Sequence, residues 1–361
     1  MPLAAALSPP LLTSDLPGLG GRIKVFPEDF EVEEIPAYEP SGSGDFLYLW
    51  VEKRDMGAEY FVRQVAKRLD IPTGEVGTAG LKDRRAVTRQ MVSVPGHLEE
   101  RLKQIDGDGI RLLRVSRHGN KLRPGHLHGN RFRILVRDGS QAAEENLPPL
   151  LRRLREHGVP NYYGVQRFGR DGETLHIGLA LLRKEQPILA GGRKAQVRNP
   201  FLRKLALSAA QSGFFNHYLG RRLADGLGRT VLKGDVMAKV PFGGMFVAED
   251  IETEQKRFDA RETVTAGPIF GRKTFPAAYD AAQREEATLT AFGLTRESFG
   301  GFGKLVQGTR RHNLIYLADL ASAPEPDGLR FNFTLPAGSY ATVLLREIMK
   351  TEIADEDAVT T

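Results

Sequence analysis

Hydrophobic and polar positions alternate in several short stretches of the first half of the chain, and this period of two is typical of half-buried strands. The clearest stretch is 130–137, where every second residue is apolar and arginines take most of the alternate positions. We expect a strand there with one apolar and one cationic face. Two further strands are expected at 45–53 and at 91–94.

Other stretches repeat apolar residues at helical spacing, and one of them ends in Gly158 and Pro160, which are helix-stopping residues. Strands that come early, helices mixed among them and the lack of a regular βαβ alternation predict an α+β fold rather than a doubly wound one. Helices are expected at 58–69, 147–157, 202–224 and 340–353.

The composition narrows the class of protein. With 361 residues, of which 41% are hydrophobic and 27% charged, the chain has enough apolar material for one large domain or two. The absence of cysteine excludes disulfides, thiolate metal sites and cysteine nucleophiles. No apolar run is long enough for a membrane helix, and residues 1–14 carry no basic residue and several prolines. We therefore expect a flexible tail at 1–14 and a cytoplasmic protein.

Positive charge is concentrated in one part of the chain. Residues 101–137 hold ten basic side chains and two acidic ones, a net charge of +8 that exceeds the +6 of the whole chain. A second basic cluster consists of Arg193, Lys194, Arg198, Arg203 and Lys204. A run of charge is usually a solvated face, but this degree of segregation favours a surface that binds a polyanion.

The sequence lacks the common cofactor motifs. The segment 267–274 resembles a phosphate-binding loop, but its second glycine comes one residue early and Arg272 precedes Lys273. His126 and His128 lie two residues apart, and nothing near them in the sequence completes a metal site. No metal, nucleotide or flavin cofactor is expected.

The segment that carries candidate chemistry is Gly80–Gln90 (GLKDRRAVTRQ), in which Asp83 is the single acid. The neighbouring cations Lys82, Arg84 and Arg85 favour the carboxylate form of Asp83 and attract a phosphate backbone. The segment is thus either an anionic nucleophile or base inside an anion-binding site, or an ordinary charged turn.

This segment resembles the signature of the TruD family of tRNA pseudouridine synthases. Four other blocks resemble motifs of that family and occur in the family's order, so that the resemblance covers roughly Gly21 to Glu352. These blocks are Asp29–Pro36 (DFEVEEIP), Gly129–Ile134 (GNRFRI), Pro160–Gly169 (PNYYGVQRFG) and Leu335–Thr342 (LPAGSYAT) with Arg346 and Glu347.

The resemblance implies a pseudouridine synthase catalytic domain with a mixed, mainly antiparallel sheet flanked by helices, and an α/β TRUD domain inserted into it. We expect the catalytic domain at 15–158 and 317–354, the inserted domain at 159–316 and a second tail at 355–361. RNA would lie in a cleft between the two domains, with Asp83 at its floor.

The resemblance also implies roles for individual residues. Asp83 matches the family's essential aspartate, and Phe132 matches the position that lies against the target base, although a core phenylalanine fits its strand pattern equally well. Asn130, on the same strand face, is expected to bond a base edge or to orient Asp83. Lys82 and Glu34 match further active-site positions, and Glu34 is otherwise a surface acid. The remaining substrate-binding candidates are Arg84, Arg131 and Arg133.

The function implied is that of a tRNA pseudouridine synthase that isomerises uridine 13 of tRNA, as a monomer and without a cofactor. Two alternatives from other classes remain. One is a non-catalytic RNA-binding protein or tRNA chaperone that uses the same basic surfaces. The other is a glycosidic or RNA-strand hydrolase, which is weakened because glycosidases need two carboxylates and the Asp83 segment offers one.

Overall fold

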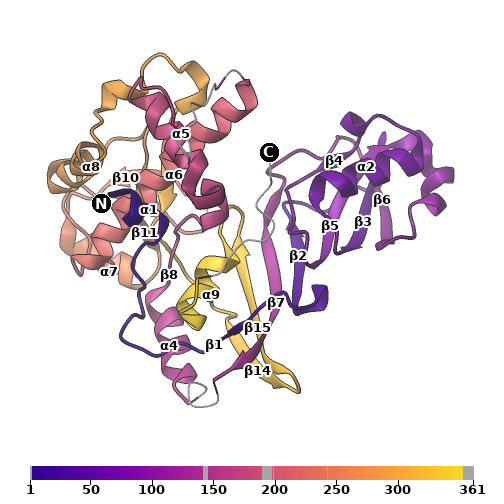
Figure 1. Cartoon of the computed structure of the whole chain (residues 1–361), viewed down its shortest axis with the longest axis horizontal. Helices are drawn as coiled ribbons and strands as arrows, with labels where there is room; N and C mark the ends of the chain where they lie inside the picture. Colours follow the sequence, from indigo (N-terminus) through magenta and orange to yellow (C-terminus); the bar gives the residue numbers. More distant parts are fainter. Residues whose placement is uncertain (1, 141–144, 189–196, 198, 242, 353–361) are drawn as a thin grey trace.

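The computed structural model describes residues 2–140, 145–188, 197, 199–241 and 243–352. They form an α+β fold with a nine-stranded sheet, a four-stranded sheet and a short two-stranded ladder (Figure 1). The strand order in the large sheet is β14-β15-β7-β2-β5-β3-β6, with β1 beside β7 and β4 beside β5. Among these described strands β2 and β5 pair in parallel and every other pair is antiparallel, so the expected mixed, mainly antiparallel sheet is confirmed.

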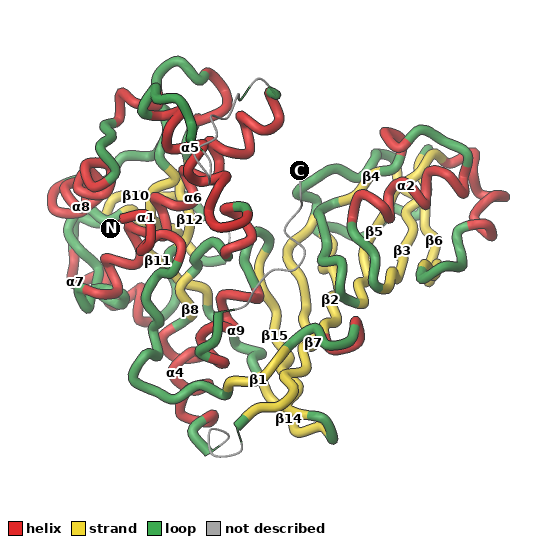
Figure 2. The backbone as a smooth tube through the Cα atoms, viewed as in Figure 1, coloured by secondary structure: helices red, strands yellow, loops and turns green. Residues whose placement is uncertain are grey.

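The large sheet draws its strands from both ends of the chain. In Figure 2 these strands run from β14 at the bottom of the view to β6 on the right. Their bounds are β1 Gly20–Arg22, β2 Phe30–Pro36, β3 Phe46–Arg54, β4 Gly77–Thr78, β5 Val87–Pro95, β6 Ile110–His118, β7 Leu127–Gly139, β14 Ala321–Glu325 and β15 Gly328–Pro336.

The central strand β7 has the predicted two-faced pattern. Phe132, Ile134 and Val136 are buried and pack with β2 and β15 against α4 (Leu147–His157) and α9 (Ala341–Met349). A separate core lies between β3, β5 and β6 on one side and α2 (Ala58–Leu69) and the 3-10 segment η3 (Gly96–Gln104) on the other. The helices expected at 58–69 and 147–157 are confirmed at their predicted ends.

A second body of helices and short strands surrounds the long helix α6 (Figure 1). Phe214 in the middle of α6 meets the rings of Phe270, Phe292 and Phe299 edge-on, within a core that also holds α5 and α8. The helices are α5 Glu173–Leu182, α6 Pro200–Ala224, α7 Ile251–Asp259 and α8 Tyr279–Ala291, and the strands are β9 Val236–Lys239, β10 Met245–Val247, β11 Thr263–Ile269 and β12 Thr309–His312.

The chain enters and leaves this second body through one ladder, in which β8 (Val159–Pro160) pairs with β13 (Leu314–Ile315). Beyond β13 the chain returns to the large sheet, where β15 pairs with β7 along its whole length. This path supports an inserted unit between positions 159 and 316. The domain division itself stays a prediction, and the tail expected at 355–361 lies outside the described residues.

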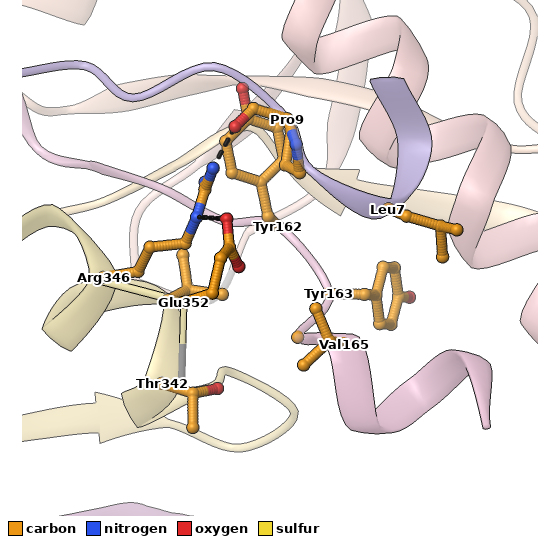
Figure 3. Close-up of a pocket in the computed structure, with 10 residues that line it drawn as sticks. Leu7, Pro9, Tyr162, Tyr163, Val165, Thr342, Arg346 and Glu352 are labelled. Atoms are coloured by element: carbon orange, nitrogen blue, oxygen red, sulfur yellow. Dashed lines mark hydrogen bonds and ion pairs between the residues drawn. The ribbon is translucent and has the colours of Figure 1, made fainter. Parts of the chain in front are cut away.

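The expectation of a loose N-terminal tail is wrong for the described residues that precede β1. Pro2–Leu7 form helix α1, which packs on α6 and buries Ala6 completely. Leu3, Ala6 and Leu7 form the apolar face of a docked helix, and Pro9 and Pro10 follow its end. Pro9, in the segment after α1, lines a cavity of about 30 Å³. There Arg346 Nη1 donates to the carbonyl of Pro9 at 2.7 Å (Figure 3).

The last helix is shorter than expected. Helix α9 ends at Met349, because Lys350 takes a left-handed conformation with φ of 57° and its N–H closes the helix on the carbonyl of Arg346. Its buried Glu347 receives bonds from the N–H groups of Leu12 and Thr13 at 2.7 and 3.1 Å. The first and last segments of the described chain are thus bound to each other.

Candidate active site

The predicted site residues come from three segments that meet on the large sheet. Glu34 lies on β2 opposite Asn130 of β7, and Phe132 lies two residues further along β7. Lys82 and Asp83 lie in the connection between β4 and β5. Pairing between strands therefore brings together residues that are far apart in the sequence.

Asp83 is held by two lysines that lie far from it in the chain. Lys24 Nζ binds Asp83 Oδ1 at 2.8 Å, and Lys53 Nζ donates to the backbone carbonyl of Asp83 at the same distance. Among the described residues Oδ2 of Asp83 has no hydrogen-bond partner, and 35% of the side chain is exposed. The carboxylate is thus oriented through one of its two oxygens.

That the neighbouring cations Lys82, Arg84 and Arg85 favour the carboxylate form of Asp83 stays a prediction, but Lys82 is not its ion-pair partner. Lys82 turns inward to another acid, and the side chains of Arg84 and Arg85 are exposed, with Arg85 directed to the carbonyl of Val25. Residues adjacent in a chain carry their side chains in different directions, so a position next to Asp83 in sequence is not a position next to its carboxylate.

Glu34 and Lys82 form a buried ion pair beneath the loop. Lys82 Nζ binds Glu34 Oε2 at 2.7 Å with 3% and 1% of the two side chains exposed, and Glu34 Oε1 accepts a bond from the Met91 N–H at 3.2 Å. Breaking such a pair costs about 3–5 kcal/mol because it leaves one charge buried and unpaired. The interpretation of Glu34 as a surface acid is therefore wrong, and the pair anchors the loop that carries Asp83. Substrate binding by either residue stays a prediction.

A series of ring contacts runs from Lys24, the partner of Asp83, through Phe30 of β2 to Phe132 of β7 and Phe333 of β15. The Lys24 ammonium that binds Asp83 lies 4.4 Å from the centre of the Phe30 ring, and Phe30 meets Phe132 edge-on at 6.1 Å. Phe132 also stacks on Phe333 of β15 at 5.2 Å. Phe132 is 6% exposed, so most of its ring belongs to the core, and its predicted contact with a base uses the small part that remains open.

Asn130 carries an unsatisfied acceptor at this place. Its side-chain oxygen is buried and has no hydrogen-bond partner among the described residues. A buried acceptor without a donor costs about 1–3 kcal/mol. A ligand with an N–H or O–H group at this position would remove that cost.

Sequence reasoning missed Lys24, Lys53 and Phe333 and gave no role to Phe30. Lys24 lies six residues before Phe30, and the φ of 57° at Lys24 is an unusual backbone conformation that the sequence does not reveal. Lys53 is completely buried near the end of β3. From the sequence a lysine at such a position is expected to be exposed, because lysines are rarely buried. Only the tertiary contacts identify these residues.

The charge of residues 101–137 is largely neutralised by acids from elsewhere in the chain. Arg131 pairs with Glu33 at 3.0 Å and Arg133 with Glu31 at 3.6 Å. Counting acids within the stretch alone therefore overstates its free charge, although RNA binding by Arg84, Arg131 and Arg133 stays a prediction. The other pairs are Arg101 with Asp70, Arg111 with Glu52, Arg114 with Glu39, Arg117 with Glu99, and Arg137 with Asp29 and Asp327.

The second basic cluster is only partly described. Arg193, Lys194 and Arg198 lie outside the described residues, while the Arg203 guanidinium lies 5.4 Å from the centre of the Phe302 ring.

Over the described ranges, no three His, Cys, Asp or Glu side chains are grouped so that they could hold a metal ion. Nor does any helix within those ranges have the length and apolar character needed to cross a membrane.

Comparison with known proteins gives one consistent family. The family model "tRNA pseudouridine synthase D (TruD)" matches residues 7–187 and 195–348. The chain is 43% identical over 352 residues to the tRNA pseudouridine synthase D of Anaeromyxobacter sp. (strain Fw109-5), covering 96% of this chain and 99% of the relative. It is 42% identical over 347 residues to a tRNA pseudouridine synthase D of Thermus thermophilus, covering 96% of this chain and 93% of that relative.

A solved structure shares the fold. It is a crystal structure from Methanosarcina mazei described as a tRNA pseudouridine synthase D (TruD), with a TM-score of 0.79 and 24% sequence identity. The similarity covers 97% of this chain and 98% of that one. The arrangement of both bodies is therefore one that an experimentally solved protein also adopts.

Proposed function

Because the chain belongs to the TruD family of tRNA pseudouridine synthases, we propose that it isomerises uridine 13 of tRNA to pseudouridine, with Asp83 as the catalytic carboxylate. The proposed enzyme works as a monomer in the cytoplasm, where tRNA is its substrate.

The reaction rearranges bonds within one nucleotide. The glycosidic bond from N1 to C1′ breaks, the base turns over, and a bond from C5 to C1′ forms while the proton on C5 is lost and N1 gains one. No electron or group is transferred to another molecule, so the balance requires no cofactor. It requires a carboxylate that reaches the ribose or C6 of the base, either as a nucleophile or as a base that removes a sugar proton.

The observation that carries the proposal is the position of the Asp83 carboxylate. Lys24 holds one oxygen, Lys53 and the buried pair of Lys82 and Glu34 hold the loop, and the second oxygen has no hydrogen-bond partner among the described residues. A reacting group that is held in place loses little entropy in the transition state. In the proposed mechanism this support allows Asp83 to act without a second catalytic carboxylate.

The target base must leave its stack, which costs a few kcal/mol. In the proposed complex the uracil ring lies against the edge of Phe132, whose other contacts with Phe30 and Phe333 keep it from moving. The free acceptor oxygen of Asn130 receives the N3–H of the base. A base stacked on an open ring face contributes about 1–3 kcal/mol and an edge contact contributes less, so these contacts recover part of the flipping cost.

Nucleoside analysis of an unmodified tRNA transcript tests the proposal. Purified protein is incubated with the transcript, and mapping by chemical labelling locates any pseudouridine, which we expect at position 13 and not in a transcript with cytidine there. Unchanged uridine with tight binding would favour an RNA-binding protein or chaperone instead. Free uracil or cut strands would favour a hydrolase.

A further inference from the structure

A cavity of about 960 Å³ lies between the large sheet and the second body. Its wall on the sheet side includes Ile35 of β2, Gly129 of β7 and Pro336 of β15, which are paired neighbours. Ile35 directly follows Glu34, and Gly129 directly precedes Asn130, along the paired strands. Leu335 of β15, which is paired with Asn130, also lines the cavity, so the cavity adjoins the candidate active site. Its volume lies within the range of about 300–1,000 Å³ that is typical of ligand sites.

The opposite wall carries a cation that has no acidic partner. Arg311 Nε donates to the carbonyl of Asn161 at 2.8 Å, and Nη2 donates to the carbonyl of Gly338 at 2.9 Å and to the Asn161 side chain. The guanidinium lies 4.1 Å from the centre of the Tyr163 ring. No carboxylate in the described part of the chain forms an ion pair with Arg311.

The neighbouring arginine, Arg310, differs from Arg311 in having an acidic partner. Arg310 is buried and pairs with the buried carboxylate of Glu285, so its charge is neutralised within the protein. Burial lowers the pKa of Arg311, and Arg167 lowers it further, because a second cation lies nearby. Arginine stays charged nonetheless, so the cavity wall has an uncompensated positive charge that is partly removed from water.

Arg167 adds to this charge. It donates to the hydroxyls of Ser208 and Ser212 and lies 6.0 Å from the Tyr163 ring, and it too has no acidic partner among the described residues. Burial and Arg311 lower the pKa of His312, which lines the cavity, so its ring is neutral at physiological pH. Among the described residues that line the cavity Asp319 is the one acid, and it accepts a bond from the Thr334 N–H at 3.1 Å.

We propose that this cavity binds the RNA nucleotide next to the target uridine, with Arg311 on its phosphate. The proposal rests on the proposed function, because a flipped uridine at Asn130 must continue into the neighbouring nucleotides, and the cavity starts at the adjacent strand positions. An arginine on the cavity wall without an acidic partner among the described residues is the chemistry of a backbone contact, since arginine pairs with phosphate.

The first test compares binding of labelled tRNA across a salt titration. Arg311→Gln is expected to weaken binding about tenfold at low salt and to reduce the magnitude of the log–log slope by about 0.7–0.9, the share of one phosphate. Arg311→Lys should keep most of the slope because it keeps the charge. Arg284→Gln is the matched control, since Arg284 on α8 is already neutralised by Asp225. Wild-type affinity and slope for Arg311→Gln would overturn the proposal.

A second variant tests the cavity without removing any native contact. Gly244 lines the cavity, and a Cβ added there meets no atom within 4 Å, so Gly244→Trp should fold normally and fill part of the space. We expect about tenfold weaker tRNA binding with an unchanged melting temperature. Gly74→Trp is the control, because Gly74 in η2 (Thr73–Glu75) is equally open but lies away from the cavity lining. Wild-type binding by Gly244→Trp would place the nucleotide elsewhere.

These tests separate the two proposals. If the wild-type protein forms no pseudouridine, the proposed function fails whatever the variants bind. If it forms pseudouridine while Arg311→Gln and Gly244→Trp both bind tRNA like the wild type, only the cavity assignment fails.

Discussion

At the scale of single residues, the candidate chemistry depends on how Asp83 is supported. The lysines that hold it lie 59 and 30 positions away, and one of them, Lys53, is completely buried. Lys53 also donates to the carbonyl of Met56 and so connects the loop to the end of β3. The carboxylate is therefore fixed by the fold and not by its own segment.

Asp83→Asn should abolish pseudouridine formation. The two side chains have nearly the same size, so the loop and its contact with Lys24 should survive, but the nucleophilic or basic oxygen is lost. Affinity for tRNA should stay the same or become slightly tighter, because Lys24 then has one acid less beside it. Single-turnover assays with excess enzyme check this, after mass spectrometry has excluded deamidation. Activity near the wild-type rate would place the catalytic carboxylate elsewhere.

Lys24→Gln should slow turnover by about 10- to 100-fold, because a carboxylate that is misplaced by about 1 Å loses that much rate. Lys24→Arg should recover part of the loss, and the pH–rate profile should shift for Lys24→Gln if the ammonium acts through Asp83. Lys256→Gln, in an exposed ion pair with Glu252 on α7, is the control. Equal rates for Lys24→Gln and the wild type would show that Lys24 only packs on Phe30.

At the scale of elements, the arginine face of β7 is part of a charge ladder. Glu31 and Glu33 of β2 and Glu52 of β3 alternate with Arg89, Arg131, Arg133 and Arg330 from β5, β7 and β15. Exposed ion pairs of this kind contribute about 0–1 kcal/mol each to stability. The ladder therefore holds the cations in register without requiring RNA.

Changing Arg131 and Arg133 together to glutamine should reduce the salt slope of tRNA binding by less than one unit, although two charges are removed. The reason is that Glu33 and Glu31 already neutralise them, in contrast to Arg311. The same salt titration measures this. A reduction of about 1.4–1.8 units, the share of two phosphates, would show that both arginines leave their glutamates to bind RNA.

Deleting residues 2–13 should destabilise the body that contains α9. Glu347 is almost completely buried, and the N–H groups of Leu12 and Thr13 and the Thr13 hydroxyl are its main donors. Each buried polar group left without a partner costs about 1–3 kcal/mol, so a clear fall in the melting temperature is expected. Ser8→Ala, which removes an exposed bond to Glu352, should change it little. An unchanged melting temperature after the deletion would show that α1 is dispensable for the fold.

At the scale of the whole molecule, the sheet and the second body enclose the cavity beside the candidate site, and the chain passes between them at the β8–β13 ladder. Arg311 donates across this junction to the carbonyls of Gly338 and Asn161, next to the ladder. An RNA that occupies the site is thus expected to touch both bodies.

Binding of tRNA should weaken steeply with salt. If about five phosphates are contacted, the log–log slope should lie around −3 to −5. A fluorescence titration from low to moderate ionic strength measures it. A slope near zero would mean that the phosphate backbone contributes little and that the basic surfaces serve solubility.

Local patterns in the sequence determined the elements and the candidate acid. The alternation at 130–137 and the helical spacing at 58–69 and 147–157 depend on which residues are apolar, and burial in the structure follows that pattern. The family motifs identified Asp83, Asn130 and Phe132 as candidates, because each of these residues lies within a short contiguous segment that resembles a motif.

Only the tertiary structure decided which charges meet. The sequence placed Asp83 among Lys82, Arg84 and Arg85, whereas the fold gives it Lys24 and gives Lys82 to Glu34. The fold also makes a packed helix of residues 2–7, which were expected to be a tail. It places Arg311 on a cavity wall, where none of the described acids pairs with it. The physical reason is that apolar periodicity acts within one element, whereas an ion pair is set by strand register and by the packing of segments that are distant in the chain.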